Sequence, residues 1–235
     1  MHNLIKIENL TIYADELLLI DNLSINIMPE STVLVLSDNG LSIKYLLKSI
    51  AGIHFPDSGN LILDNSNIYT FNKNEENDIR KRISFVFEKG ALLSNLDLEK
   101  NLLLTLDFHF PNEPYERKIS RIKAFLHDFE LDLDLSLRPS QIKEEQIKLL
   151  GFIRSLLSEP SLVIYDEPFR YTDANTKKII IRKMRELKAN NITQIIKTQF
   201  NEEFVKHCDI IYYIKKGKLF FSGNIKDFID SQIEL

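Results

Sequence analysis

Hydrophobic residues along this 235-residue chain change their spacing several times, and each change marks an element. Leu23, Ile25 and Ile27 alternate with polar residues, and short apolar runs elsewhere are bounded by polar turns, which predicts strands. The predicted strands lie at residues 23–27, 33–36, 61–63, 83–87, 162–165, 192–196 and 210–214. Helix-type spacing over residues 43–51 and 174–189 predicts helices between them. Strands that alternate with helices indicate an α/β fold with a mainly parallel sheet covered on both faces.

The middle of the chain follows a different pattern. From residue 92 to residue 157 there is no convincing strand, only helical stretches broken by the turn HFPNEP at 109–114 and by Arg138-Pro139. We therefore expect a single domain in which residues 1–91 and 158–235 form the α/β core. Residues 92–157 would form a helical subdomain inserted into that core.

Composition narrows the class of protein. Hydrophobic residues make up 44% of the chain, which suffices for a sizeable core. The formal charge of −4 and the scattered basic residues argue against a nucleic-acid partner. Cys208 is the only cysteine, so an internal disulfide is excluded and a reducing compartment is expected. No apolar stretch approaches the ~20 residues of a membrane span, and the first residues lack the build of a signal peptide.

The segment LVIYDEP, residues 162–168, carries the clearest candidate chemistry. It predicts a buried parallel strand that delivers Asp166 and Glu167 at its C-terminal end, where open α/β sheets place ligands. In nucleotide hydrolases such a pair holds magnesium and orients the attacking water. The sequence leaves a structural alternative open, in which the two carboxylates cap loop amides or pair with Arg170 or Lys44.

The order of these elements resembles the nucleotide-binding subunit of ABC transporters over nearly the whole chain. The resemblance rests on NLTIYADELLLIDNLSINI, SDNGLSIKYLLKSIAG, FVFEKGALLSNLDLEKNL, RPSQIKEEQIKLLGFIRSLLSEPSLVIYDEPFRYTDANT and DIIYYIKKGKLFFSG. FEKGALLSNLDLEKNL together with DEPF is most similar to the Mla-type subunits that drive lipid transport. The resemblance implies a P-loop NTPase-like ABC ATPase domain with an N-terminal antiparallel β part, and ATP and Mg²⁺ as cofactors.

The resemblance assigns the ATP phosphates to the loop after the second predicted strand. Its matching positions are Ser37, Asp38, Asn39, Gly40, Ser42, Lys44 and Tyr45. Such a loop needs glycines that turn amides onto the phosphates, a lysine that neutralises them, and a Ser or Thr hydroxyl on magnesium. Here Ser37 and Ser42 occupy glycine positions, and Ile43 and Lys44 stand at the lysine and hydroxyl positions.

The loss of that lysine has a large electrostatic effect. One cation about 4 Å from a phosphate is worth about 4 kcal/mol at an effective dielectric constant near 20. Lys44 is a poor substitute, because consecutive helical side chains point ~100° apart. We therefore expect no tight Mg-ATP binding and favour a plain strand–loop–helix connection at this position.

The family signature LSGGQ aligns with residues 142–146, where Lys143, Glu144 and Glu145 replace the serine and the two glycines and Gln146 matches the final glutamine. Ser140 is predicted to cap the following helix, with the two glutamates in its first turn, where the helix dipole stabilises carboxylates. A triphosphate brought there would meet two negative charges. The favoured alternative is an ordinary helix start that packs Ile147, Leu150, Ile153 and Leu157 inward.

Four further positions take roles from the resemblance. Glu88 stands where the family has a glutamine that senses the γ-phosphate, and Gln199 stands where it has the catalytic histidine. A glutamine cannot shuttle a proton near neutral pH. Tyr13 aligns with the aromatic residue that stacks on adenine, and Asp173 with the aspartate after the acidic strand. Both also have structural readings, Tyr13 as a strand-end aromatic and Asp173 as a helix cap.

Family members close as head-to-tail dimers in which each ATP lies between one loop and the partner's signature. Because this chain departs at both motifs, neither a homodimer nor a heterodimer would contain a complete site. We therefore expect a degenerate ABC subunit that docks on a membrane permease, on the cytoplasmic face, with little or no hydrolysis. A second nucleotide-binding subunit and MCE-type lipid-binding components are the implied further partners.

The resemblance places permease docking in a groove around residues 88–101. Leu92, Leu93, Leu96 and Leu98 would supply apolar contacts there, and the alternative for some of them is that they only join the insertion to the core. Two other functions stay open. One is an active but atypical Mg-ATPase that uses Lys44, Asp166 and Glu167, and the other is a soluble regulatory or scaffold protein.

Overall fold

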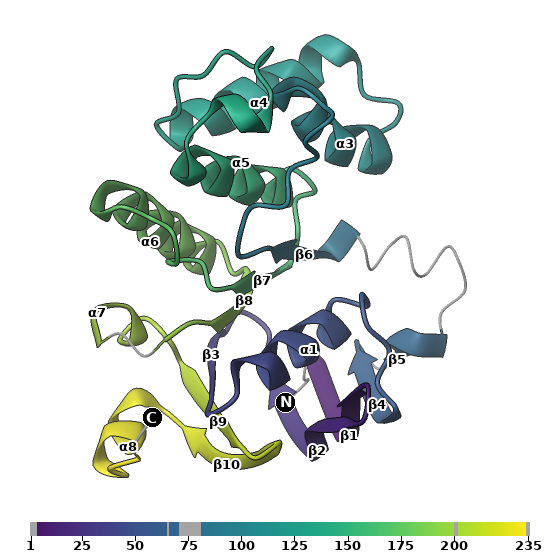
Figure 1. The fold of residues 1–235 in the computed structure, drawn as a ribbon, viewed down its shortest axis with the longest axis vertical. Helices are drawn as coiled ribbons and strands as arrows, with labels where there is room; N and C mark the ends of the chain where they lie inside the picture. Colours follow the sequence, from purple (N-terminus) through teal and green to yellow (C-terminus); the bar gives the residue numbers. More distant parts are fainter. Residues whose placement is uncertain (1–3, 65, 71–80, 200–201, 234–235) are drawn as a thin grey trace.

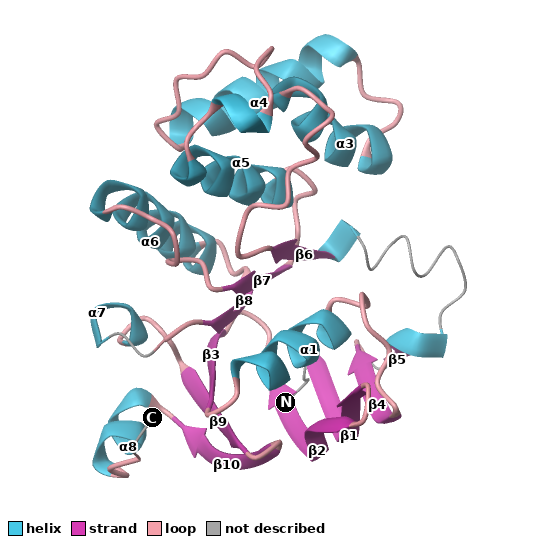
Figure 2. Cartoon of the chain, viewed as in Figure 1, coloured by secondary structure: helices cyan, strands magenta, loops and turns pink. Residues whose placement is uncertain are grey.

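The computed structural model describes residues 4–64, 66–70, 81–199 and 202–233. Two β-sheets form the lower and middle parts of the molecule in Figure 1, and a group of helices lies at the opposite end from the antiparallel sheet. Figure 2 shows the same arrangement by type of secondary structure, with the strands concentrated at one end. The predicted α/β class is confirmed.

The smaller sheet is antiparallel and lies near the N-terminus. Its strand order is β2-β1-β4-β5. The strands are β1 (Ile5–Ala14), β2 (Leu17–Ile27), β4 (Ser58–Leu63) and β5 (Ser66–Asn67). Ile5 pairs with Ile27 and Ile7 with Ile25, so that the alternating apolar side chains of β1 and β2 share one buried face. This sheet is the antiparallel part that the family resemblance implied.

The larger sheet has six strands in the order β10-β9-β3-β8-β7-β6. Its strands are β3 (Thr32–Ser37), β6 (Ile83–Val86), β7 (Leu162–Asp166), β8 (Thr193–Lys197), β9 (Ile210–Lys215) and β10 (Lys218–Gly223). All neighbours are parallel except β9 and β10. β7 is buried at every residue, as its continuous apolar run predicts for a strand covered on both faces.

The periodicity missed β1 at the start of the chain and also the last two elements. β10 pairs with β9 at the edge of the sheet, and the short helix α8 (Ile225–Asp230) follows it. No residue of β10 is buried, so its sequence lacks the alternation that marks a half-buried strand.

The two helices predicted from periodicity are present. α6 (Ala174–Ala189) has the predicted bounds, whereas α1 (Gly40–Ile50) begins three residues before the predicted start at 43. The earlier start follows from Asn39, whose side chain accepts the backbone N–H of Leu41 and caps the helix. A single turn, α7 (Glu202–Val205), and a 3₁₀ turn, η1 (Ile68–Thr70), complete the α/β part.

Residues 92–157 contain helices and no strand, as predicted. The helices are α3 (Leu98–His109), α4 (Tyr115–Asp128), the 3₁₀ turn η2 (Pro139–Gln141) and α5 (Glu144–Leu156). Figure 1 shows α3, α4 and α5 together, beyond the edge strand β6. We keep the name helical subdomain for residues 92–157, and its boundaries remain a prediction. Within the described residues no helix has the length and apolar character needed to cross a membrane.

Two hydrophobic cores hold these parts together. One joins α3–α6 to one face of the large sheet, and the other fills the space between the small sheet, α1 and the opposite face. The helical subdomain approaches the core most closely at two glycines: a Cβ on Gly151 in α5 would lie 2.4 Å from Cα of Gly90. Only glycine fits there, so α5 lies directly on the segment that follows β6.

Candidate nucleotide site

The loop between β3 and α1 uses its own side chains to bind its backbone amides. The N–H of Asn39 donates to Oγ of Ser37 at 3.0 Å, and the N–H of Leu41 donates to Oδ1 of Asn39 at 3.0 Å. The carboxylate of Asp38 accepts the backbone N–H of Lys216 at 3.2 Å. A phosphate loop presents such amides to the anion instead. In this chain serine and asparagine side chains take up two of them.

The first turn of α1 buries the residue at the lysine position of the phosphate loop and the serine before it. Ile43, at the lysine position, is 1% exposed and belongs to the core beneath the small sheet. Ser42 is 2% exposed, and its N–H donates to the carbonyl of Asn39 at 3.1 Å. The ring of Tyr45 lies edge-on to His54 with 4.8 Å between centroids, and Lys44 is half-buried.

Asp166 ends β7 and Glu167 follows it, as predicted, but their cationic partner is a residue that the sequence did not indicate. Nζ of Lys197, the last residue of β8, lies 2.8 Å from Oδ1 of Asp166 and 3.5 Å from Oε1 of Glu167. The two carboxylates therefore do pair with a cation, as the structural alternative expected. The predicted partners, Arg170 and Lys44, were wrong, because β8 rather than the 37–45 segment delivers the nearest ammonium group.

Arg170 pairs instead with Glu88, at 2.9 Å between Nη1 and Oε1. Beneath them, the ammonium of Lys148 donates to the backbone carbonyls of Glu88 at 2.6 Å and Glu167 at 2.7 Å. Lys148 is 1% exposed, and this burial lowers its pKa to about 8 against the opposing attraction of Glu88, Asp166 and Glu167. Three cations and three carboxylates thus balance one another within the protein.

The signature region forms the start of α5, and the predicted cap was wrong. Ser140 lies within η2, and the cap of α5 is Lys143, whose N–H donates to Oε1 of Gln146 at 3.0 Å. The helix therefore starts three residues later, after the 3₁₀ turn that Pro139 begins. Glu144 and Glu145 do lie in the first turn, as predicted.

The inward face of α5 is confirmed in part. Leu150, Ile153 and Leu157 are completely buried, as predicted. Ile147 is only half-buried and lines a cavity of about 410 Å³, which we call the helical groove. The groove is lined by Glu88, Lys89, Ala91, Leu92, Pro139, Glu144, Ile147, Lys148 and Tyr171.

Three further motif positions lie at the ends of strands and helices. Asp173 caps α6 by accepting the N–H of Thr176 at 2.7 Å, which confirms the structural reading. Tyr13 is 42% exposed near the end of β1, and its N–H donates to Oδ2 of Asp57 at 2.7 Å. Gln199 is exposed just beyond β8. The roles of Tyr13 and Gln199 toward a nucleotide stay predictions.

The structure brings part of the predicted site together. A cavity of about 540 Å³ is lined by Val35, Leu36, Ser37, Gly40, Ile43, Glu167, Lys197, Thr198 and Gln199. Loop, acidic strand and Gln199 therefore share one cavity, at the carboxyl ends of β3, β7 and β8. Glu88 and Glu144 line the helical groove instead, so within one chain the signature does not join this cavity.

The order of strands, the two sheets and the inserted helices are those of a known family, and the family model described as ABC transporter matches residues 20–170. The chain belongs to the ABC transporter family. The resemblance and the ABC ATPase fold drawn from the sequence are both confirmed. Members of this family bind ATP, typically with magnesium.

Among curated proteins, the chain is 27% identical to the intermembrane phospholipid transport system ATP-binding protein MlaF of Haemophilus influenzae, over 98% of this chain and 87% of that protein. It is 25% identical to the lipoprotein-releasing system ATP-binding protein LolD of Buchnera aphidicola, over 89% and 91%. A sulfate/thiosulfate import ATP-binding protein CysA of Caulobacter vibrioides is 29% identical, but the chain spans about half of its length, 54%.

Solved structures agree on the fold. A dimeric ATP-binding cassette in a post-hydrolysis state, bound to ADP and Pi, superposes with a TM-score of 0.85 at 21% identity, over 94% of this chain and 98% of that one. CbiO1 of Clostridium perfringens, part of an ABC transporter complex, gives 0.81 at 22% identity, over 99% and 92%.

The residues of this chain do not fit the magnesium and phosphates that the family binds. Asp166, the position for a metal ligand, already carries the ammonium of Lys197, and loop amides are bound by Ser37 and Asn39. In the described part of the chain, no group of three or more His, Cys, Asp or Glu side chains is arranged to hold a metal ion. The Asp166 and Glu167 carboxylates of the site are therefore paired with a cationic side chain of the same chain.

Sequence reasoning missed Lys148 and Lys197. Lys197 had a usable signal: it ends a β-branched run, and the carboxyl ends of neighbouring parallel strands meet at one edge of the sheet. Lys148 had none, because a lysine among apolar helix residues usually extends its head to solvent. Only the close packing of α5 on the segment after β6 buries it.

Proposed function

We propose that this chain is a degenerate ABC subunit that docks on a membrane permease and hydrolyses little or no ATP itself. The observation that carries the proposal is the ion pair between Lys197 and Asp166, together with the self-bonded 37–40 loop. A competent site needs free amides and a carboxylate open to metal. Both are engaged here by the chain's own groups.

The substituted motifs also argue against ATP hydrolysis by this chain. The buried side chain of Ile43 carries no charge to a phosphate, and Glu144 and Glu145 place negative charge at the helix start that would face a partner's nucleotide. Because loop and signature are both altered, pairing with a competent second subunit would still leave each composite site without one half. The proposed contribution of this chain is therefore binding rather than hydrolysis.

The surface for a permease is the helical groove with the adjoining 93–97 loop. Leu93 is 46% exposed, and Leu92 and Leu96 are half-buried beside it. Leu98 is completely buried in the core, so for this residue the alternative role of joining the insertion to the core holds. Docking there would put the chain on the cytoplasmic face of the membrane.

Similarity to MlaF supports a lipid transport complex with MCE-type components, because that relative is matched over 98% of this chain. LolD, which is also matched over most of its length, belongs to a lipoprotein-releasing system. Both names support a role at a membrane. No residue of this chain would contact cargo in such an architecture, so the cargo follows from the relatives alone.

The proposal is tested by nucleotide binding and turnover of the purified chain. We expect no micromolar affinity for Mg-ATP by calorimetry, and phosphate release that is the same in wild type and Glu167→Gln. Micromolar affinity, or turnover that disappears in Glu167→Gln, would instead establish the active, atypical ATPase.

A further inference from the structure

We propose that Lys197 is the built-in cation of the acidic pair, holding Asp166 and Glu167 in the way that a divalent metal ion does in a competent nucleotide site. This inference deepens the proposed function, on which it rests in one respect: both concern the cavity that contains Asp166 and Glu167. Its direct consequence is that divalent cations bind this carboxylate pair more weakly while Lys197 is present than when its charge is removed.

The backbone places Lys197 between the two halves of the site. In the parallel ladders, Lys197 lies opposite Asp166 of β7 on one side and opposite Val35 of β3 on the other. The N–H of Glu167 also donates to the carbonyl of Lys197 at 2.9 Å. The side chain therefore starts directly between the acidic strand and the strand that leads into the 37–40 loop.

The side chain then extends along the loop. A Cβ added to Gly40, the first residue of α1, would lie 3.8 Å from Cε of Lys197, an ordinary contact. Its ammonium group ends 2.8 Å from Asp166 and 3.5 Å from Glu167. The stem of Lys197 therefore lies at van der Waals distance from the start of α1, and the cation reaches both carboxylates from the loop side.

Burial of the two carboxylates means that Lys197 and a divalent metal ion would exclude each other at this pair. The side chains of Lys197, Asp166 and Glu167 are 13%, 4% and 16% exposed. A buried carboxylate is strongly unfavourable without a partner, so one cation must remain at the pair. A divalent ion next to a fixed ammonium would meet repulsion in a poorly screened environment. Only one of the two cations can therefore occupy the pair. Lys197 has the advantage, because it is part of the chain and does not have to bind from solution.

The other cations near the site are engaged elsewhere or lie too far away. Arg170 pairs with Glu88, and Lys148 donates to backbone carbonyls. Lys44 is half-buried on α1 and forms no ion pair with any residue that the structure describes. Lys197 is thus the cation within ion-pair distance of both carboxylates among the described residues.

The test compares a single and a double mutant with the wild type by thermal unfolding and by Mn²⁺ binding, using the isolated full chain. Lys197→Met keeps the stem and removes the charge, and we expect a lowered Tm that added Mn²⁺ raises again. In Lys197→Met/Asp166→Asn the more deeply buried of the two carboxylates is also neutralised, so Tm should recover in part without metal. Lys44→Met is the matched lysine control, and its Tm should not respond to Mn²⁺.

Mn²⁺ affinity, measured by the loss of the free-ion paramagnetic resonance signal, should be at least about tenfold higher in Lys197→Met than in wild type, because repulsion from the ammonium is removed. Equal Mn²⁺ affinity in the two proteins would overturn the inference, as would a double mutant no more stable than Lys197→Met. Neither readout involves a membrane partner or ATP turnover, so permease docking stands or fails separately.

Discussion

Lys148 shows at the residue scale how internal contacts hold the motif segments of this chain. A lysine head with 1% exposure binds two carbonyls, one from Glu88 and one from Glu167, and ties α5 to both motif segments. Glu167 itself adopts a positive φ of 53°, which is unfavourable for a side-chain-bearing residue. The hydrogen bond from Lys148 to its carbonyl helps to hold that conformation.

The pKa of Lys148 predicts a pH dependence of stability. Burial lowers this pKa from 10.5 to about 8 in the folded chain. Between about pH 8 and pH 10.5 the unfolded state binds more protons than the folded state, so the free energy of unfolding rises with pH. Below about pH 8 Lys148 is charged in both states, and the burial of its charge lowers the free energy of unfolding by its full amount. Urea unfolding of wild type and Lys148→Met from pH 7 to pH 10 measures the difference.

In that comparison, the stability of wild type relative to Lys148→Met should increase as the pH rises through this range. A difference that stays constant would mean that Lys148 keeps an ordinary lysine pKa in the folded chain.

Single residues also separate what the sequence could predict from what it could not. Asp173 was predictable as a cap, because its hydrogen bond is local, to Thr176 three residues on. The partner of Asp166 was not, because Lys197 is 31 residues away and becomes a neighbour only through the register of β7 and β8. Local chemistry is visible in sequence, whereas partners across strands depend on register.

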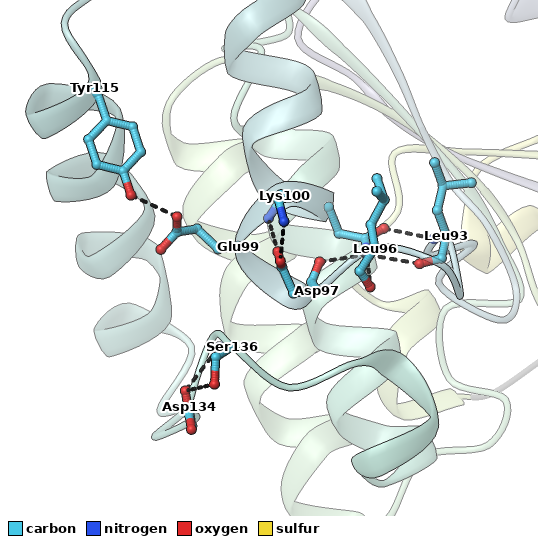
Figure 3. Close-up of polar contacts among 9 residues, drawn as sticks. Leu93, Leu96, Asp97, Glu99, Lys100, Tyr115, Asp134 and Ser136 are labelled. Atoms are coloured by element: carbon cyan, nitrogen blue, oxygen red, sulfur yellow. Dashed lines mark hydrogen bonds and ion pairs between the residues drawn. The ribbon is translucent and has the colours of Figure 1, made fainter.

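At the scale of elements, the 93–97 loop is fixed by the first turns of α3. Asn101, completely buried, accepts the N–H of Leu93 and donates to the carbonyls of Leu93, Leu96 and Asp97. Figure 3 shows Leu93, Leu96 and Asp97 close to one another, with Asp97 bound to Lys100. The exposed Leu93 is therefore presented by a rigid loop.

Asn101→Ala should release that loop. Leaving buried backbone groups of the loop unpaired typically costs about 1–3 kcal/mol each, so we expect a lower free energy of unfolding and faster amide hydrogen exchange over residues 93–97. Asn95→Ala, at an exposed position of the same loop, is the matched control and should change neither. Unchanged exchange in Asn101→Ala would show that the loop is held by other contacts.

Elements also show the limits of pattern reading. The apolar runs of β3, β7 and β8 and the spacing of α6 were sufficient to predict them, since burial on both faces or on one helix face imposes a pattern. β10 was missed because an exposed edge strand is under no such constraint. The start of α5 was misplaced because Pro139 begins a separate 3₁₀ turn before it.

For the whole molecule, the ABC fold has been kept while the charges in its nucleotide site are satisfied internally. Fold and family could be read from the order of motifs, because both depend on the sequence of elements along the chain. The proposed docking role depends on a partner, and the sequence of one chain would carry only the partner-facing half of such an interface. The helical groove and Leu93 are the parts of this half that the structure exposes.

Site-specific photo-crosslinking in native membranes tests the docking claim most directly. A photoreactive residue replaces Leu93, 46% exposed beside the helical groove, or, as control, Phe55, which is 68% exposed beyond α1. We predict a crosslink from position 93 to an integral membrane protein, none from position 55, and the same yield when Glu167→Gln is added. No membrane crosslink at position 93, or equal crosslinking from both positions, would contradict the account.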